Sequence, residues 1–94
     1  MTGDSNIDIL FTPRAWYEYT GWQLEDKKTL RRINKLIEDT IRHPFNGIGK
    51  PEALKALDGC WSRRIDETNR LVYKVAGPED AKQLIIFQCK THYE

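Results

Sequence analysis

The segment that decides the fold is Trp61-Ser62-Arg63-Arg64-Ile65-Asp66-Glu67-Thr68-Asn69-Arg70-Leu71-Val72-Tyr73. Apolar and polar residues alternate toward both of its ends, and turn-forming residues lie between them. The pattern predicts a β-hairpin that carries three arginines. A guanidinium stays charged and donates paired hydrogen bonds, so it can hold a phosphate as well as coat a solvated strand. The function of the hairpin therefore depends on where its arginines point.

Side chains alternate across a strand, so the predicted hairpin has two different faces. With a turn at Glu67–Asn69, Asp66 pairs with Arg70 and Arg64 pairs with Val72. The core face then holds Trp61, Arg63, Ile65, Leu71, Tyr73 and Val75, and the opposite face holds Arg64, Arg70 and Lys74. A slip of one residue would reverse the faces. The opposite face is either an exposed sheet with a weak Asp66–Arg70 ion pair or an anion site.

The chain before the hairpin predicts one strand and two helices. Ile7–Phe11 is a short apolar strand, and Thr12 and Pro13 are a favourable N-cap and first helical residue. The first helix should end near Trp22, with Ala15, Trp16 and Tyr19 on its inner side.

Asp26 caps a second helix, which Pro44 ends just after His43. Its apolar face is Leu30, Ile33, Leu36, Ile37 and Ile41, and its polar face is Lys27, Lys28, Arg31, Arg32, Lys35 and Glu38.

The rest of the chain predicts a loop and three strands. Residues 45–59 form the loop, with a helical turn at Glu52–Lys55, and strands follow at about 60–66, 70–76 and 82–91. The resulting order, strand, two helices and a three-stranded antiparallel meander, predicts an α+β fold with the helices on one face. We expect a single domain over residues 7–94 and a disordered extension at residues 1–6.

Composition excludes several classes of protein. Of the 94 residues, 39% are hydrophobic and 31% charged, which is typical of a globular domain rather than a disordered chain. No apolar run is long enough to span a membrane and no signal peptide is evident, so we expect a cytoplasmic protein without membrane association. Cys60 and Cys89 should be reduced, and no zinc-ligand spacing is present.

Charge is distributed unevenly along the chain. Residues 1–26 carry one basic residue against five acidic ones, and residues 27–55 carry eight against three. The basic middle is either a solvated helix face or an anion-binding surface.

Five motifs together resemble the YoeB family of bacterial toxins, within the RelE-like superfamily of ribosome-dependent mRNA interferases. They are Ile33–Thr40 with Pro44-Phe45, Lys50–Lys55, Gly59–Ile65, Arg70–Tyr73 and the closing His92-Tyr93. The resemblance implies a fold like that of small microbial ribonucleases and cleavage of mRNA in the ribosomal A site. It also implies neutralisation by a YefM-like antitoxin, and it allows a homodimer.

The resemblance further implies a role for individual residues. Glu52 corresponds to the general base, Arg70 to the phosphate-binding arginine, His92 to the general acid and Tyr93 to a further site residue. Lys50, Lys55 and Arg64 correspond to secondary phosphate or RNA contacts. The basic helix residues Lys27, Lys28, Arg31, Arg32 and Lys35 are candidates for contact with ribosomal RNA. The chain departs from the family at Cys60, where an aromatic residue is common, and at Glu94, which follows the His-Tyr pair.

These residue types suit RNA cleavage without a metal or cofactor. The 2′-OH needs a base, the leaving 5′ oxygen needs an acid, and the phosphorus centre needs a cation. Two alternatives remain at this stage: a non-catalytic toxin or binding protein on the same scaffold, directed at a target such as gyrase, and a free-standing ribonuclease. A single candidate imidazole makes the free-standing enzyme a weaker hypothesis, because a ribosome can supply the positioning that such an enzyme would lack.

Overall fold

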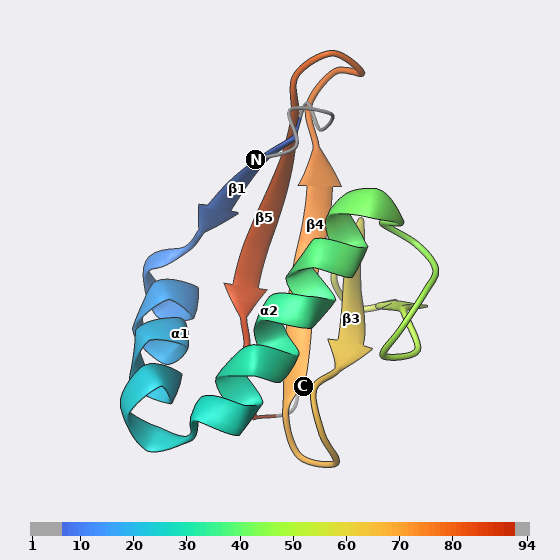
Figure 1. The fold of residues 1–94 in the computed structure, drawn as a ribbon. Coiled ribbons are helices and arrows are strands. Elements are labelled where there is room, and N and C mark those ends of the chain that lie inside the picture. Colours follow the sequence, from blue (N-terminus) through green and yellow to red (C-terminus); the bar gives the residue numbers. More distant parts are fainter. Residues whose placement is uncertain (1–6, 92–94) are drawn as a thin grey trace.

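The computed structural model describes residues 7–91, which form a five-stranded sheet with both helices packed on one face (Figure 1). The elements are β1 (Ile7–Phe11), α1 (Pro13–Glu25), α2 (Lys27–Arg42), β2 (Glu52–Ala53), β3 (Cys60–Arg64), β4 (Arg70–Ala76) and β5 (Lys82–Gln88). The strand order is β1-β5-β4-β3-β2, with β1 parallel to β5 and every other pair antiparallel. The predicted α+β class and the β3–β4–β5 meander are confirmed.

Both helices begin at the predicted caps. Thr12 accepts a hydrogen bond from the amide of Ala15 at 3.1 Å, and Asp26 accepts from the amides of Lys28 and Thr29. The predicted end of α1 at Trp22 is wrong. The helix continues to Glu25, because the carbonyl of Trp22 still accepts the amide of Asp26 at 2.9 Å. The buried Trp22 indole donates to the carbonyl of Cys89 at 2.9 Å.

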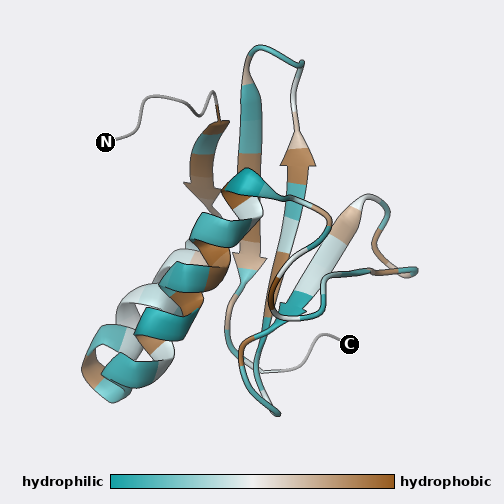
Figure 2. Cartoon of the chain, turned by 45° about the vertical axis from the view of Figure 1, so that its right-hand side comes forward, coloured by the Kyte–Doolittle hydropathy of each residue, from teal (hydrophilic) through white to brown (hydrophobic). Residues whose placement is uncertain are grey.

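The core lies between the helices and the face of the sheet that they cover. Its fully or nearly buried residues are Ala15, Trp22, Ile33, Leu36, Ile37, Ile65, Leu71, Tyr73, Leu84, Ile86 and Cys89. Figure 2 shows the outer side of α2 as hydrophilic. Trp16 does not belong to this core, contrary to its predicted place. It is 52% exposed and stacks on Tyr19 and against Phe11 at the edge of the sheet.

The predicted hairpin faces are correct, but the predicted register is wrong by two residues. Arg64 pairs with Arg70, and Ser62 pairs with Val72. The cause is the longer loop: the carboxylate of Asp66 accepts the amides of Thr68 and Asn69 and closes a wider turn. A shift of two residues preserves the alternation of side chains, so each arginine keeps its predicted face.

Two other predicted elements differ from the structure. Glu52–Lys55 is not a helical turn, because Glu52–Ala53 pairs with β3 as an edge strand. The last strand ends at Gln88 rather than at residue 91, and a bulge near its end shifts its register against Val72 and Tyr73. The bulge places Gln88 opposite Val72.

Arg63 is buried completely, and its guanidinium forms hydrogen bonds to several parts of the fold. It bonds the carboxylate of Asp39 at 2.6 Å and the Tyr73 hydroxyl at 3.3 Å. It also donates to the carbonyls of His43, Asn46 and Ile48. The bond from Arg63 lowers the pKa of Asp39 below its ordinary value. The Arg63 guanidinium therefore joins the last turn of α2, the following loop and the sheet.

Both cysteines are free and buried. Burial, with a contribution from the charge of Glu18, raises the pKa of the Cys89 thiol to about 12, which leaves it unreactive. Across residues 7–91, neither helix has the length and apolar character needed to cross a membrane. The expected disorder of residues 1–6 and the assignments to His92, Tyr93 and Glu94 lie outside the described residues.

We predict that Arg63→Met lowers the free energy of unfolding by about 3–5 kcal/mol, because it leaves Asp39 and several carbonyls without their buried partner. Arg63→Lys should recover only part of this loss, since an ammonium group cannot reach all of these acceptors at once. Urea unfolding followed by circular dichroism measures both changes. Arg64→Lys, on the exposed neighbour, is the control and should change stability by less than about 0.5 kcal/mol.

The lowered pKa of Asp39 predicts an acid-sensitive fold. A carboxyl whose pKa is depressed in the folded state stabilises the protein above its unfolded pKa, and this contribution is lost as the pH falls below about 4. Wild-type stability should therefore fall more steeply between pH 5 and pH 3 than that of Asp39→Asn, which cannot titrate at this position. Parallel slopes for the two proteins in urea titrations at each pH would contradict the prediction.

Candidate functional site

The side of the sheet away from the helices carries a row of paired residues from four strands, of which Glu52 is exposed and Ser62, Val72 and Gln88 are buried. Glu52 pairs with Ser62, Ser62 with Val72, and Val72 with Gln88. Directly paired residues project to the same side of a sheet, so these four side chains share one face. We call this side of β2–β5 the open face.

A second row of the open face brings two arginines together. Arg64 of β3 pairs directly with Arg70 of β4, next to the Ser62–Val72 pair. From strand spacing and residue rise, the Cα atoms of Glu52 and Arg70 lie about 12 Å apart. A carboxylate and a guanidinium on long side chains can therefore approach one phosphodiester from two sides. Lys74 pairs with Cys60 on the same face, on the other side of the Ser62–Val72 pair from the two arginines.

Arg70 is half-buried, and carbonyl groups of the hairpin loop fix the position of its guanidinium. Its Nη1 donates to the carbonyl of Asp66 at 2.7 Å and to that of Asn69 at 3.1 Å. Its backbone amide donates to the carbonyl of Thr91 at 3.1 Å. Burial opposes ionisation of Asp66, but the amides of Asn69 and Thr68 and the charge of Arg70 outweigh it, so the pKa of Asp66 is lowered.

The path of the chain into β2 is set by two residues with left-handed backbone. Gly49 has φ +79°, and a Cβ there would lie 2.8 Å from Leu36 Cδ2, so a side chain does not fit. Lys50 follows with φ 50°, an uncommon conformation for a residue with a side chain. The carbonyl of Gly49 accepts the amide of Arg64 at 2.7 Å, which places the segment along the edge of β3 and delivers Glu52 to the open face.

The predicted site residues fall into three groups. Glu52, Arg64 and Arg70 share the open face, and the exposed Lys50 and Lys55 lie on either side of β2. The basic residues of α2 lie on the opposite side of the molecule, because α2 covers the other face of the sheet (Figure 1). His92 and Tyr93 lie outside the described residues, the last of which, Thr91, is bonded to Arg70.

The outer face of α2 forms a shallow depression of about 570 Å³. It is lined by Lys28, Arg31, Arg32, Asn34, Lys35 and Glu38, while Lys27 lies outside it. Arg32 also has a structural role, because its guanidinium donates to the carbonyls of Ile65 and Arg64 at the end of β3. The depression is therefore cationic, with one of its cations tied to the sheet.

Sequence reasoning did not identify the buried residues Gln88 and Asn69 as contributors to this arrangement. Gln88 joins the open face through the bulge in β5, which a simple alternation of side chains does not reveal. The sequence places Asn69 only in the turn, yet its side chain accepts the amide of Thr91 at 2.5 Å. A turn asparagine directly before the candidate phosphate-binding arginine was the available signal. No cluster of three or more His, Cys, Asp or Glu residues suited to a metal occurs within residues 7–91.

Comparison with known proteins identifies the family to which the chain belongs. A family model, described as the YoeB-like toxin of bacterial type II toxin-antitoxin systems, matches residues 11–93. The protein named Toxin YoeB from Streptomyces coelicolor is 54% identical over 86 residues, which cover 90% of this chain and 98% of that protein.

Solved structures show the same fold in relatives. A YoeB/ParE toxin from Agrobacterium tumefaciens superimposes with a TM-score of 0.87 at 41% identity, covering 92% of this chain and 99% of the other. A YoeB dimer from Staphylococcus aureus gives a TM-score of 0.82 at 41% identity, covering 95% of this chain and all of that one. A chain of the heterotetrameric YoeB-YefM complex from that organism gives a TM-score of 0.80 at 42% identity, covering 93% of this chain and 98% of that one. The chain therefore belongs to the YoeB-like toxins of bacterial type II toxin-antitoxin systems.

Proposed function

We propose that this toxin is a ribosome-dependent endoribonuclease, which arrests translation and growth by cutting mRNA in the ribosomal A site. The observation that carries the proposal is the composition of the open face, where Glu52, Arg64 and Arg70 project from three neighbouring strands. A carboxylate opposite two guanidiniums suits an RNA phosphodiester, because one group can accept a proton and the others can hold negative charge.

The paired arginines support an anion as the natural occupant of this face. Arg64 and Arg70 lie directly opposite each other, and like charges in such a pair are destabilising. The carboxylate of Asp66, two residues after Arg64, accepts hydrogen bonds from the amides and side chain of the hairpin loop. A phosphate between the two guanidiniums would offset their repulsion and receive paired hydrogen bonds.

The proposed reaction uses the 2′-OH of the RNA as its nucleophile. Glu52 removes the proton of the 2′-OH while Arg70 stabilises the charge that develops on the phosphoryl oxygens. His92 gives a proton to the departing 5′ oxygen, and Tyr93 stacks on a base at the cut. The products are a 2′,3′-cyclic phosphate and a 5′-hydroxyl. The fixed position of Arg70 on the hairpin carbonyls favours this role, because an oriented cation does not need to reorganise during the reaction.

The basic outer face of α2 is the proposed contact with the ribosome. The cationic depression on α2 faces away from the open face, so it can contact ribosomal RNA while the open face contacts mRNA. Lys50 and Lys55, on either side of β2, add RNA contacts next to Glu52. This activity places the toxin in the cytoplasm, where translating ribosomes are found.

Binding partners follow from the relatives. The Staphylococcus aureus YoeB has been solved with YefM and as a dimer. We infer that a YefM-like antitoxin neutralises the present toxin and that the toxin can form a homodimer.

We predict that Glu52→Gln and Arg70→Ala each abolish growth arrest and mRNA cleavage while the proteins remain folded. Each change removes one group from the reacting centre, and loss of such a group typically costs about a hundredfold or more in rate. Toe-printing of mRNA on translating ribosomes measures the cleavage. Glu79→Gln, in the exposed turn between β4 and β5, is the control and should stay toxic. Full toxicity of both site variants, or arrest with intact mRNA, would favour a non-catalytic toxin.

We predict that joint replacement of Lys28, Arg31 and Lys35 by alanine weakens ribosome binding. Each cation that neutralises a phosphate steepens the dependence of log affinity on log salt by roughly one, so the triple variant should reduce the slope by up to about three. Sedimentation with ribosomes at several salt concentrations gives the slope. Arg32 is retained in this variant because it docks α2 onto β3. Lys82→Ala, at the far end of the sheet, should leave the slope unchanged.

A further inference from the structure

Thr91 has an unusual backbone conformation at the edge of the proposed site. Its φ is 67°, and within residues 7–91 only Lys50 shares a positive φ among residues other than glycine. A β-branched residue in this region is a genuine outlier that persists only when its surroundings fix it. Such strain concentrates at functional sites, so the contacts that hold Thr91 are informative.

Two consecutive residues of the hairpin hold Thr91 at both ends. The side-chain oxygen of Asn69 accepts the Thr91 amide at 2.5 Å, and the amide of Arg70 donates to the Thr91 carbonyl at 3.1 Å. Asn69 is only 9% exposed, and its Nδ2 donates to both carboxylate oxygens of Asp66 at 3.2 and 3.1 Å. Asp66 therefore turns the amide of Asn69 so that its oxygen faces Thr91.

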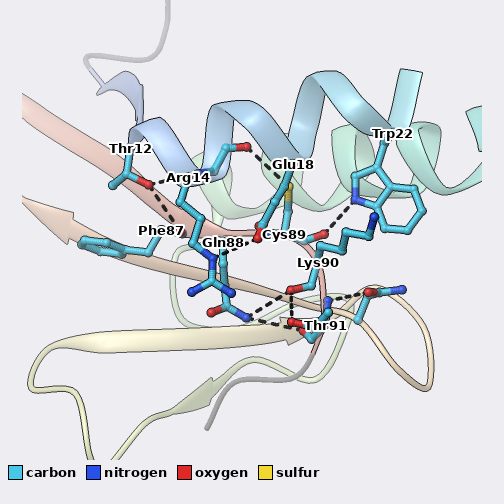
Figure 3. A network of polar contacts seen from close by, with 11 residues as sticks. Thr12, Arg14, Glu18, Trp22, Phe87, Gln88, Cys89, Lys90 and Thr91 are labelled. Atoms are coloured by element: carbon cyan, nitrogen blue, oxygen red, sulfur yellow. Dashed lines mark hydrogen bonds and ion pairs between the residues drawn. The ribbon is translucent and has the colours of Figure 1, made fainter. Parts of the chain in front are cut away.

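Helix α1 fixes the residues just before Thr91 (Figure 3). After β5 ends, the amide of Cys89 donates to Glu18 at 2.8 Å, and its carbonyl accepts the indole N–H of Trp22 at 2.9 Å. Lys90 then forms an ion pair with Glu25 at 3.0 Å. Side chains from elsewhere in the fold thus replace the sheet hydrogen bonds over this segment, and they hold it as far as Thr91.

We propose that Asn69 is a positioning residue, which fixes the backbone of Thr91, the residue directly before the proposed general acid His92 in the sequence. The inference rests on the proposed function, because it assigns the purpose of the contact to the general acid. Arg70 presents its guanidinium to the open face and binds Thr91 through its own backbone. Arg70, the proposed phosphate-binding residue, is therefore joined directly to Thr91, the residue before the proposed acid, by one backbone hydrogen bond. Asn69 adds a second hydrogen bond to Thr91 through its side chain.

The test compares Asn69→Ala with Glu67→Ala, an exposed change in the same turn. Asn69→Ala should lower kcat for cleavage on saturating ribosomes by about tenfold to a hundredfold and leave KM unchanged, because displacement of a catalytic group by about 1 Å has an effect of this size. Glu67→Ala should match wild type. An Asn69→Ala protein that is folded and has wild-type kcat would overturn the proposal.

A double variant separates positioning from a general structural role. If Asn69 acts through His92, adding Asn69→Ala to His92→Ala should cause no further loss of rate. A second loss as large as in the wild-type background would overturn the proposal.

Thr91→Pro and Thr91→Gly provide a second route that does not alter the hairpin. Proline removes the bonded amide and cannot adopt the positive φ, whereas glycine keeps the amide and accepts the φ without strain. Thr91→Pro should therefore lose more activity than Thr91→Gly, and the opposite order would overturn the proposal.

Hydrogen exchange tests the contact without reference to activity. The amide of Thr91 should be protected from exchange in wild type and lose this protection in Asn69→Ala. Equal protection in both proteins would show that Asn69 does not hold Thr91. If wild type left mRNA intact on ribosomes, the proposed function would fail, and the exchange experiment would still decide whether Asn69 holds Thr91.

Discussion

The buried contact between Arg63 and Asp39 is the interaction on which the other parts of the structure depend. Arg63 has no exposed surface, and it ties the last turn of α2 to β3 through a 2.6 Å bond. The same guanidinium binds three carbonyls of residues 43–48, a segment with no regular secondary structure. Because that segment leads through Gly49 into β2, the position of Glu52 on the open face follows from a charge pair on the opposite face of the sheet.

Consecutive arginines of β3 therefore serve opposite purposes. Alternation sends Arg63 into the core and Arg64 to the open face, one residue apart. A guanidinium is tolerated in the core only when its N–H groups find acceptors. The loop carbonyls and the hydroxyl of Tyr73 accept these hydrogen bonds. On the open face, beside Arg70, the same group keeps its capacity for a ligand. One short strand thus builds the scaffold with one arginine and the candidate site with the next.

Elements that depend on local pattern were predictable, and those that depend on tertiary contacts were not. The caps at Thr12 and Asp26 and the periodicity of α2 are local, so sequence located both helix starts and the apolar face. The faces of Arg64 and Arg70 followed from alternation. The register did not, because Asp66 builds a wider turn, and β2 was missed because its pairing depends on Gly49 and Arg64, 15 residues apart. Glu52 and Arg70 could therefore be proposed from motifs, whereas Asn69 and Gln88 required the structure.

Lys50 and Thr91 share one feature that relates the scaffold to the chemistry. Each has a left-handed backbone, and each lies shortly before a proposed acid or base, Glu52 or His92. The strain of both residues is balanced by bonds to the β3–β4 hairpin, through the carbonyl of Gly49 on one side and the backbone of Thr91 on the other. The hairpin thus acts as a rigid centre to which two irregular segments are attached. A proposed acid or base that follows such a segment depends on this support, because small displacements of an acid or base lose most of its effect. Three consecutive residues accordingly have three different roles: Asn69 binds Thr91, Arg70 carries the proposed phosphate-binding group, and Leu71 packs in the core.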